Sequence, residues 1–265
     1  MIGNKLRETM ETGKLAIGMF NYTASPAFVE ILGYSGFDFV IIDTEHTSID
    51  FRTAEHLIRA AESSGITPLI RVYENTCSLI NKALNFGAKG IVVPHVNTEE
   101  QAKLAVQFTK YPPVGARAAC PGTRAAGYSI ENWKDYYAQA NRDTLVILLL
   151  EGKEALENLD ALLSVSGVDV VFVGPWDLSQ SLGVPGQAYD HPAVVKALDD
   201  VVSKAMDKGI SVMTVPLPTW TNEKITMFRD RGVNMICFPD DFLIFSDAVR
   251  RVAKLKELAK AVKAN

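Results

Sequence analysis

Residues 144–177 read TLVILLLEGKEALENLDALLSVSGVDVVFVGPWD, and this stretch decides the fold. Apolar runs at 144–150 and 168–173 flank a helical pattern over 153–164, with Gly167 directly before the second run. Both runs are apolar at consecutive positions, which is typical of strands covered on both faces in a parallel sheet. A glycine at that point favours the end of a helix. The stretch therefore predicts two parallel strands joined by a right-handed helical crossover.

The same unit repeats along the chain. Expected strands span 15–20, 37–42, 67–72, 90–96, 144–150, 168–173, 210–215 and 233–238. Expected helices span 25–34, 52–64, 77–86, 98–111, 153–164, 192–208, 221–231 and 241–263. Eight such units in 265 residues favour a (β/α)8 TIM barrel, which takes about 250 residues, over an open doubly wound sheet, which usually has fewer strands. We therefore expect one barrel domain over residues 1–265.

Composition and charge restrict the partners. The chain is 48% hydrophobic and 22% charged, with a net charge of −4, as in an ordinary globular protein. Scattered Lys and Arg leave no basic face for nucleic acid, and the longest apolar runs are far shorter than the roughly 18–20 residues of a membrane helix. The polar start, without a secretory signal, favours the cytoplasm. Three widely spaced cysteines predict neither a disulfide framework nor a zinc site.

One long stretch, residues 111–132, is poor in both patterns and rich in Gly, Pro and Ala. A loop longer than about 12–15 residues in a compact domain is usually functional or mobile. Because this loop precedes the fifth expected strand, we expect it to reach the catalytic face of the barrel.

Carboxylates follow two neighbouring strands. In a TIM barrel the reactive groups come from the carboxyl ends of the strands and the loops after them. Glu151 follows the fifth expected strand and Asp177 follows the sixth. Two such carboxylates repel each other, and a divalent cation such as Mg²⁺, Mn²⁺ or Co²⁺ would resolve the conflict. The alternative is that each carboxylate only caps the helix that follows it.

Basic side chains follow the second and third strands. His46 stands directly after an acidic strand end, and an imidazole, with an ordinary pKa near 6.5, suits a general base that Asp43 or Glu45 could orient. Arg71 ends the third strand and can hold a developing enolate or a carboxylate with two N–H groups. The alternatives are a surface histidine and an ion pair of Arg71 with Asp43 or Glu74.

Other residues narrow the chemistry. His95 ends the fourth expected strand and could also face the substrate. No expected strand carries a lysine in its carboxyl-terminal half, so metal chemistry is preferred over a Schiff-base mechanism, which needs a desolvated lysine. The motifs of dinucleotide binding, P-loop phosphoryl transfer and serine hydrolysis are also missing.

Several stretches match one family. They are 36–38 (GFD) with 42–46 (IDTEH), 70–72 (IRV), 93–94 (VP), 111–113 (YPP) with Gly115 and Arg117, Glu151 with 154–155 (EA), and 167–169 (GVD) with 174–179 (GPWDLS). Together they resemble the HpcH/HpaI aldolase family of metal-dependent, class II pyruvate aldolases. That family includes 4-hydroxy-2-oxoheptanedioate aldolase and 2-keto-3-deoxy sugar-acid aldolases, and the resemblance covers nearly the whole chain.

The resemblance implies a barrel of the phosphoenolpyruvate/pyruvate-domain type. Such an enzyme cleaves or forms 4-hydroxy-2-oxo acids through a pyruvate enolate and an aldehyde. His46 would be the base, with Asp43 beside it, Arg71 would stabilise the enolate, and a metal would be held by two carboxylates. The residues implied at the metal and substrate are Glu151 and Asp177 for the metal, and Leu149, Gly174, Pro175, Trp176 and Asp177 for the substrate.

The resemblance also implies a homo-oligomer, from a helix-exchanged dimer to a hexamer of three dimers. The last expected helix, 241–263, carries an apolar stripe that could supply such an interface. Packing of that stripe on its own barrel accounts for it equally well.

Three positions depart from the family pattern. Leu149 stands where the family usually has glutamine, Trp176 where alanine is common, and Asn85 where an aspartate supports the histidine in the best-known members. These differences bear on substrate and rate, and they leave other functions open. One is an acyl-CoA thioester lyase or a 2-oxo-acid decarboxylase of the same superfamily. Another is a non-catalytic barrel that binds a 2-oxo acid.

Overall fold

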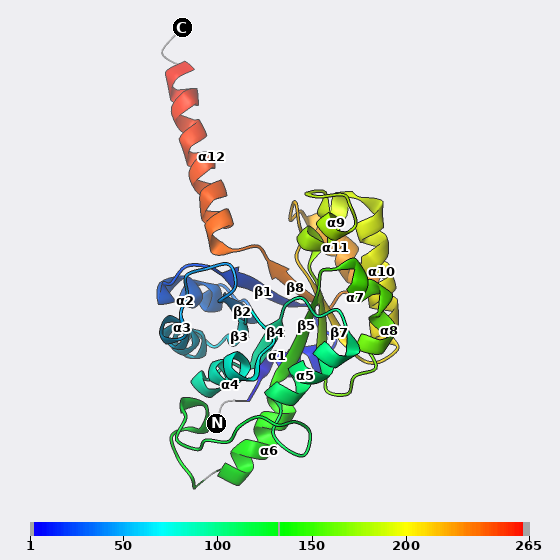
Figure 1. The fold of residues 1–265 in the computed structure, drawn as a ribbon. Helices are drawn as coiled ribbons and strands as arrows, with labels where there is room; N and C mark the ends of the chain where they lie inside the picture. Colours follow the sequence, from blue (N-terminus) through cyan, green and yellow to red (C-terminus); the bar gives the residue numbers. More distant parts are fainter. Residues whose placement is uncertain (1–2, 132, 262–265) are drawn as a thin grey trace.

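Parallel strands form a closed barrel at the centre of the molecule. The computed structural model describes residues 3–131 and 133–261, and within these ranges eight strands pair in chain order around the barrel (Figure 1). The strands are β1 (Ala16–Asn21), β2 (Phe39–Asp43), β3 (Thr67–Arg71), β4 (Gly90–Val93), β5 (Leu145–Leu150), β6 (Val170–Val173), β7 (Ser211–Thr214) and β8 (Met235–Phe238). Each overlaps one of the expected ranges, so the predicted (β/α)8 barrel is confirmed.

Helices alternate with the strands around the outside of the barrel. Those that match expected helices are α2 (Pro26–Tyr34), α3 (Phe51–Ser64), α4 (Cys77–Phe86), α5 (Glu99–Thr109), α10 (Pro192–Met206), α11 (Asn222–Arg231) and α12 (Asp241–Ala261). The helix expected at 153–164 is split into α7 (Lys153–Glu157) and α8 (Leu159–Leu162). Residues 262 and 263 of the last expected helix lie outside the described residues.

Several further helices were not predicted from the sequence pattern. They are α1 (Lys5–Glu11), α6 (Trp133–Asp143), α9 (Pro175–Ser181) and the 3₁₀ turns η1 (Arg124–Ala126) and η2 (Ala188–Asp190). Leu6 of α1 is fully buried, and the side-chain amide of Asn4, the residue that caps α1, donates to the carbonyl oxygens of Lys89 and Asp143. Since these carbonyls lie just before β4 and β5, α1 covers the amino-terminal end of the barrel.

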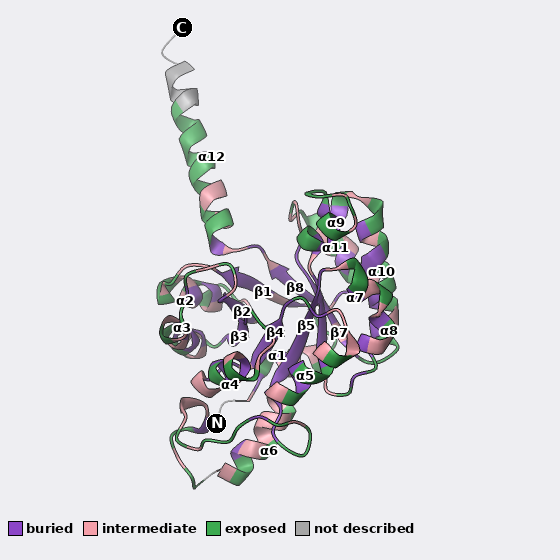
Figure 2. Ribbon diagram, in the orientation of Figure 1, coloured by how far each residue is buried: buried purple, intermediate pink, exposed green. Residues whose placement is uncertain are grey.

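Apolar residues cover both faces of the strands, and Figure 2 colours most of the barrel strands as buried. Outward-facing residues such as Ile42 pack against the helices, whereas inward-facing Phe39 and Ile41 fill the interior. The Phe39 ring lies so close to β1 that a Cβ on Gly18 would come within 2.2 Å of it. Because both faces of each strand are buried, the strand sequences are apolar at consecutive positions.

The loop expected at 111–132 lies at the amino-terminal face of the barrel, so the expectation that it reaches the catalytic face is wrong. Its Arg117 donates to Asn85 Oδ1 (3.2 Å) near the end of α4, and its Arg124 pairs with Glu62 near the end of α3. The segment leads from α5 through α6 into β5, and connections into strands lie opposite the face that carries catalytic loops. Residue 132 is outside the described residues.

The last helix, α12, extends away from the barrel (Figure 1). Asp241 at its start accepts hydrogen bonds from Asn21 Nδ2 (2.6 Å) and from the backbone N–H of Tyr22 (2.9 Å), which ties the helix to the end of β1. At the start of the helix, Phe242 meets the Tyr22 ring edge-on at 6.5 Å between centroids, and Ile244 packs against the barrel core. Six apolar side chains of α12 are nevertheless 48–66% exposed; they are Phe242, Leu243, Phe245, Val249, Val252 and Leu255. In the described part of the chain, no helix has the length and apolarity to cross a bilayer.

Candidate active site

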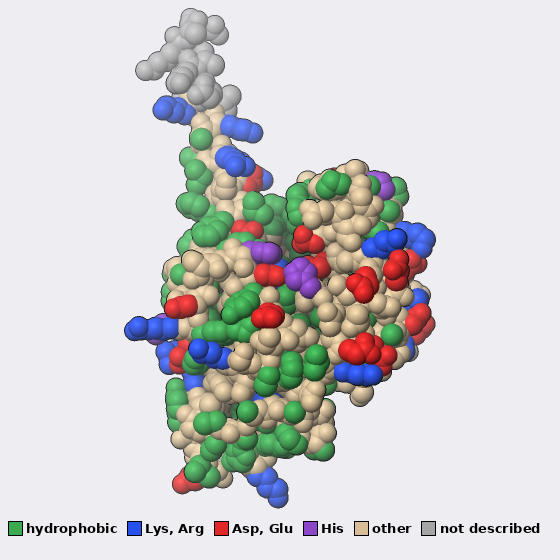
Figure 3. Space-filling view, in the orientation of Figure 1, with side chains coloured by type: hydrophobic (Ala, Val, Ile, Leu, Met, Phe, Trp, Pro, Cys, Tyr) green, Lys and Arg blue, Asp and Glu red, His purple; other side chains and the backbone are tan. Residues whose placement is uncertain are grey.

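A cavity of about 890 Å³ opens at the carboxyl ends of the strands. The predicted site residues that line it are His46, Arg71, Leu149, Glu151, Gly174, Pro175, Trp176 and Asp177. The remaining one, Asp43, is fully buried and paired with Arg71. In Figure 3, histidine and acidic side chains gather near the centre of this face, below the base of α12. The fold therefore brings the predicted residues together around one cavity.

Arg71 and Asp43 form a buried ion pair at the ends of β3 and β2, where the two residues are direct partners in the strand register. Arg71 Nε donates to Asp43 Oδ1 and Nη2 donates to Oδ2, both at 2.8 Å. Burial alone would lower the pKa of the Arg71 guanidinium, but the hydrogen bonds and charge of Asp43 raise it. The guanidinium also lies 4.6 Å from the Phe20 ring centre. The ion pair with Asp43, which sequence analysis left open as an alternative role of Arg71, is therefore formed. It fixes the permanently charged guanidinium at the wall of the cavity.

His46 follows a turn that Asp43 organises. The Asp43 carboxylate accepts the backbone N–H groups of Glu45 (3.0 Å) and His46 (3.2 Å). The imidazole itself is 56% exposed, and its Nε2 lies 3.8 Å from Glu45 Oε2. Of the two acids expected to orient this histidine, Asp43 therefore holds its backbone, and Glu45 is the carboxylate near its ring.

Glu151 and Asp177 stand after neighbouring strands, because the last residues of β5 and β6 pair with each other. Glu151 does not cap α7, whose N-cap is Gly152 and which has no side-chain cap hydrogen bond. Asp177 lies in the first turn of α9, where an acid is favoured, so this part of the alternative holds for Asp177. Burial raises the pKa of the Glu151 carboxyl; His95 opposes this shift, and the negative charges of Asp177 and Glu45 add to it. The two acids thus repel each other across the mouth of the barrel.

Free space lies beside the Glu151 carboxylate on the side of β6. Gly174 keeps it open, because a Cβ there would lie 3.3 Å from Glu151 Cβ and 3.5 Å from Glu151 Oε2. Among the described residues, no group of three or more His, Cys, Asp or Glu side chains is arranged to hold a metal ion. If Glu151 and Asp177 were its protein ligands, a cation would take its other ligands from water or substrate, as Mg²⁺ often does.

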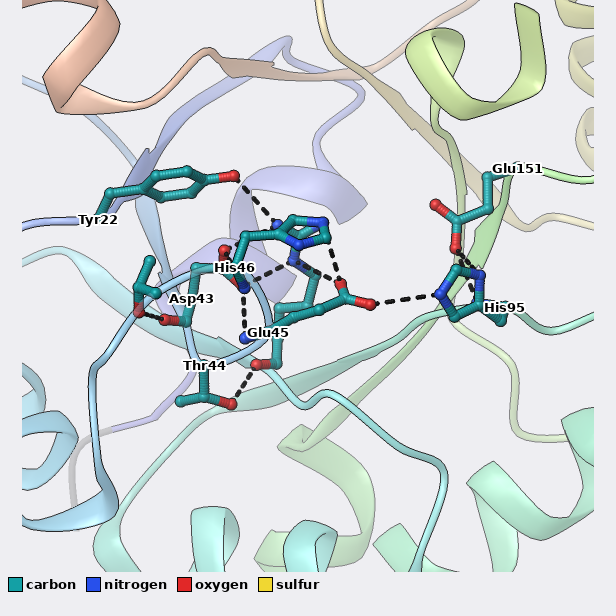
Figure 4. Close-up of polar contacts among 9 residues, drawn as sticks. Tyr22, Asp43, Thr44, Glu45, His46, His95 and Glu151 are labelled. Atoms are coloured by element: carbon teal, nitrogen blue, oxygen red, sulfur yellow. Dashed lines mark hydrogen bonds and ion pairs between the residues drawn. The ribbon is translucent and has the colours of Figure 1, made fainter. Parts of the chain in front are cut away.

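Tyr22, Glu45 and His95 also belong to this cluster of polar contacts (Figure 4). The sequence indicated Glu45 as a possible partner of His46 and left His95 as a residue that could face the substrate, but it did not single out Tyr22. Tyr22 Oη accepts from Arg71 Nη2 (3.2 Å), and burial raises the pKa of the phenol. Glu45 Oε2 lies 3.2 Å from Arg71 Nε, and Glu45 Oε1 lies 3.4 Å from His95 Nε2. For Tyr22 the available signal was its position, two residues after the end of the first expected strand.

Comparison with known proteins identifies the family. A sequence model of the HpcH/HpaI aldolase/citrate lyase family matches residues 16–237, which spans the barrel from β1 to β8. The chain belongs to this family. It is 34% identical to a 2-dehydro-3,6-dideoxy-6-sulfogluconate aldolase of Pseudomonas putida, over 93% of this chain and 92% of that protein. It is also 34% identical to a 2-keto-3-deoxy-L-rhamnonate aldolase of Klebsiella pneumoniae, over 97% and 94%.

A solved structure agrees with this membership. The crystal structure of the citrate synthase SbnG superposes with a TM-score of 0.86 at 32% identity, over 96% of this chain and 98% of that one. This member of the HpcH/HpaI family is therefore similar both to sugar-acid aldolases and to a citrate synthase. Its fold and relatives support an enzyme of the aldolase/lyase class.

The three departures from the HpcH/HpaI pattern fall in two regions. Leu149 is buried and lines the cavity, and Trp176, in the first turn of α9, is 49% exposed at its rim. Asn85 is in the last turn of α4, where it accepts a hydrogen bond from Arg117 at the amino-terminal face. Two of the departures therefore shape the site directly, whereas in the single chain Asn85 lies at the opposite end of the barrel from His46.

Proposed function

We propose that this protein is a divalent-metal-dependent aldolase that cleaves or forms 4-hydroxy-2-oxo acids by way of a pyruvate enolate and an aldehyde. The observation that carries the proposal is that Glu151 and Asp177, at the ends of neighbouring strands, line one cavity together with Arg71 and His46. A cation of the Mg²⁺, Mn²⁺ or Co²⁺ type on these carboxylates would act as a Lewis acid toward the carboxylate and keto oxygens of the 2-oxo acid.

The residues of the chain divide the remaining work. In cleavage, His46 accepts the proton of the 4-hydroxyl, the C3–C4 bond breaks, and its electrons pass into the enolate as the aldehyde leaves. Arg71, held by Asp43, stabilises the negative charge of the enolate oxygen without having to reorganise. Backbone N–H groups in the first turn of α9 receive the substrate carboxylate. The enolate then takes a proton at C3 to give pyruvate.

The reaction itself tests the proposal. The purified protein is incubated with pyruvate, a panel of short aldehydes, and Mg²⁺, Mn²⁺ or Co²⁺, and the products are followed by mass spectrometry. We expect aldol adducts that EDTA suppresses and added metal restores. Adducts that form equally well in EDTA, or no adduct across the panel, would contradict the proposal.

A second candidate is acyl-CoA thioester chemistry at the same cavity, and the likeness to the citrate synthase SbnG favours it. It is distinguished by its product. Thiol release from acetyl-CoA in the presence of a 2-oxo acid, without any aldol product from pyruvate and aldehydes, would select it. The decarboxylase and non-catalytic alternatives predict CO₂ release from the 2-oxo acid and metal-dependent binding without turnover, respectively.

Trp176 should set the preference for the aldehyde. Its ring stands at the rim of a cavity whose walls also include Leu149 and Phe172, and apolar surface buried there stabilises an apolar aldehyde. We expect Trp176→Ala to raise KM for a branched or aromatic aldehyde about tenfold, equivalent to about 1.4 kcal/mol, with KM for pyruvate unchanged. The control is Tyr34→Ala, which removes an aromatic ring that is 76% exposed at the end of α2. An equal change in both KM values would show that Trp176 does not act on the aldehyde.

We also propose that the apolar stripe of α12 is covered by a second copy of the chain, as in a helix-exchanged dimer. Exposed apolar patches of this kind usually mark interfaces. Light scattering after size-exclusion chromatography should give the molar mass of a dimer or of a larger oligomer. Val252→Glu, at a position that is 66% exposed, should shift this mass toward that of the monomer. Lys254→Glu on the same helix is the control. A wild-type monomer at micromolar concentration contradicts the proposal.

A further inference from the structure

We propose that His95 is the positioning residue of the cation site, which fixes Glu151 so that one carboxylate oxygen is occupied and the other is presented to the cavity. This inference rests on the proposed function, because it takes Glu151 as a ligand. It assigns a role to a residue that touches neither Arg71 nor His46 in the contacts that the structure records.

His95 engages a single oxygen of Glu151 twice. Its backbone N–H donates to Glu151 Oε1 (2.9 Å), and its ring Nδ1 lies 2.7 Å from the same atom. The other oxygen, Oε2, is the atom that a Cβ on Gly174 would approach to 3.5 Å. Oε1 is therefore taken up by His95, and Oε2 points to the open side of the carboxylate, toward β6 and the start of α9.

The backbone of His95 is strained in a way that this double contact explains. Its φ is +55°, in the left-handed region that residues with a Cβ adopt only at an energetic penalty. Strain of this type persists where the surroundings enforce it, and it gathers at functional sites. We infer that the left-handed turn is retained because it brings the N–H group and the imidazole of one residue to one oxygen.

The far side of the ring is held as well. Nε2 lies 3.4 Å from Glu45 Oε1, and Glu45 Oε2 lies 3.2 Å from Arg71 Nε (Figure 4). Glu45 is 10% exposed, whereas the His95 side chain is 67% exposed. A largely solvent-facing imidazole is thus fixed between two acids, which links the cation site to Arg71. Groups that hydrogen-bond to metal ligands commonly change metal affinity by about 10- to 100-fold when they are removed.

The test measures Mn²⁺ binding to the metal-free protein by the electron paramagnetic resonance signal of free Mn²⁺, together with the melting temperature. Two variants remove the imidazole. His95→Gly relieves the positive φ, whereas His95→Ala retains the strain. We expect the dissociation constant for Mn²⁺ to rise about 10- to 100-fold in both. The melting temperature without metal should be unchanged or higher in His95→Gly and should be lower in His95→Ala than in His95→Gly.

The matched control is His46→Asn, which removes the other histidine at this mouth and should leave the dissociation constant for Mn²⁺ within about twofold. If the wild type binds Mn²⁺ and both His95 variants bind it equally well, the positioning role is wrong and the proposed function stands. If the wild type binds no Mn²⁺ and forms no aldol product with any cation, the proposed function itself fails. A loss of affinity that merely follows a fall in melting temperature in both variants would assign His95 a structural role instead.

Discussion

Replacing Asp43 with alanine is expected to lower the free energy of unfolding by about 3–5 kcal/mol, the range found when one partner of a buried ion pair is removed. Asp43 has no exposed surface and makes two 2.8 Å contacts with Arg71, whose side chain is 8% exposed. Without the carboxylate, the guanidinium keeps its charge in a site from which water is largely excluded. The backbone N–H groups of Glu45 and His46 lose their acceptor at the same time.

Urea denaturation followed by circular dichroism measures this change. The control is Asp200→Ala, because the Lys196–Asp200 pair is exposed and pairs of that kind contribute about 0–1 kcal/mol. The double variant Asp43→Asn with Arg71→Met removes both charges and should recover much of the lost stability, since the penalty comes from a buried cation that keeps only the longer contact with Glu45. If Asp43→Ala lowers the free energy of unfolding by less than about 1 kcal/mol, which is the contribution of a surface pair, the Asp43–Arg71 pair does not stabilise this side of the cavity.

Replacing Glu151 with glutamine is expected to lower kcat/KM for the metal-dependent reaction by about 10³-fold, equivalent to about 4 kcal/mol of transition-state stabilisation. The amide keeps the shape of the side chain and loses the charge that we propose for cation binding. The metal-free protein, in contrast, should not be destabilised by this substitution. Because burial, Asp177 and Glu45 raise the pKa of Glu151, the neutral amide removes a repulsion and the melting temperature should be unchanged or higher.

Added metal separates the two effects. A cation at 100 times its dissociation constant stabilises the native state by about 2.7 kcal/mol, so the wild type should melt at a higher temperature with Mg²⁺ or Mn²⁺, and Glu151→Gln should not. Glu154→Gln is the control, because this acid lies in the first turn of α7 and is exposed. If Glu151→Gln retains wild-type turnover, or if metal raises its melting temperature as much as that of the wild type, Glu151 is not a ligand.

The barrel could be predicted because its physical cause lies in the local sequence. Strands covered on both faces must be apolar at consecutive positions, as in LVILLL at 145–150. This pattern can be recognised without knowing which strands and helices pack against the segment. The helix α9 could not be predicted in the same way. It has seven residues, begins at a proline and carries Asp177 in its first turn, so it lacks the repeated apolar stripe on which helix prediction depends.

The error about the long loop had a topological cause. Composition correctly indicated that residues 111–131 are mostly irregular, but composition does not tell at which end of the barrel a loop lies. The end follows from the direction of the connection, and this segment leads from a helix toward the start of a strand. The predicted site residues lie around one cavity because strand ends define one face of the barrel. The contacts of Glu45 and His95 were not predictable, since a left-handed φ at His95 and a carboxylate that turns toward it depend on the packing of three separate strand ends.

The exchange of solvent deuterium into the methyl group of pyruvate tests the central claim most directly, because it needs enolate formation and no aldehyde. Pyruvate is incubated with the protein in D₂O and Mg²⁺, and its mass is followed over time with and without EDTA. The account predicts deuterium incorporation that requires the cation and falls at least about 10³-fold, about 4 kcal/mol, in Glu151→Gln. Incorporation at the rate of buffer alone with every divalent cation tried, or equal rates in the wild type and Glu151→Gln, would contradict it.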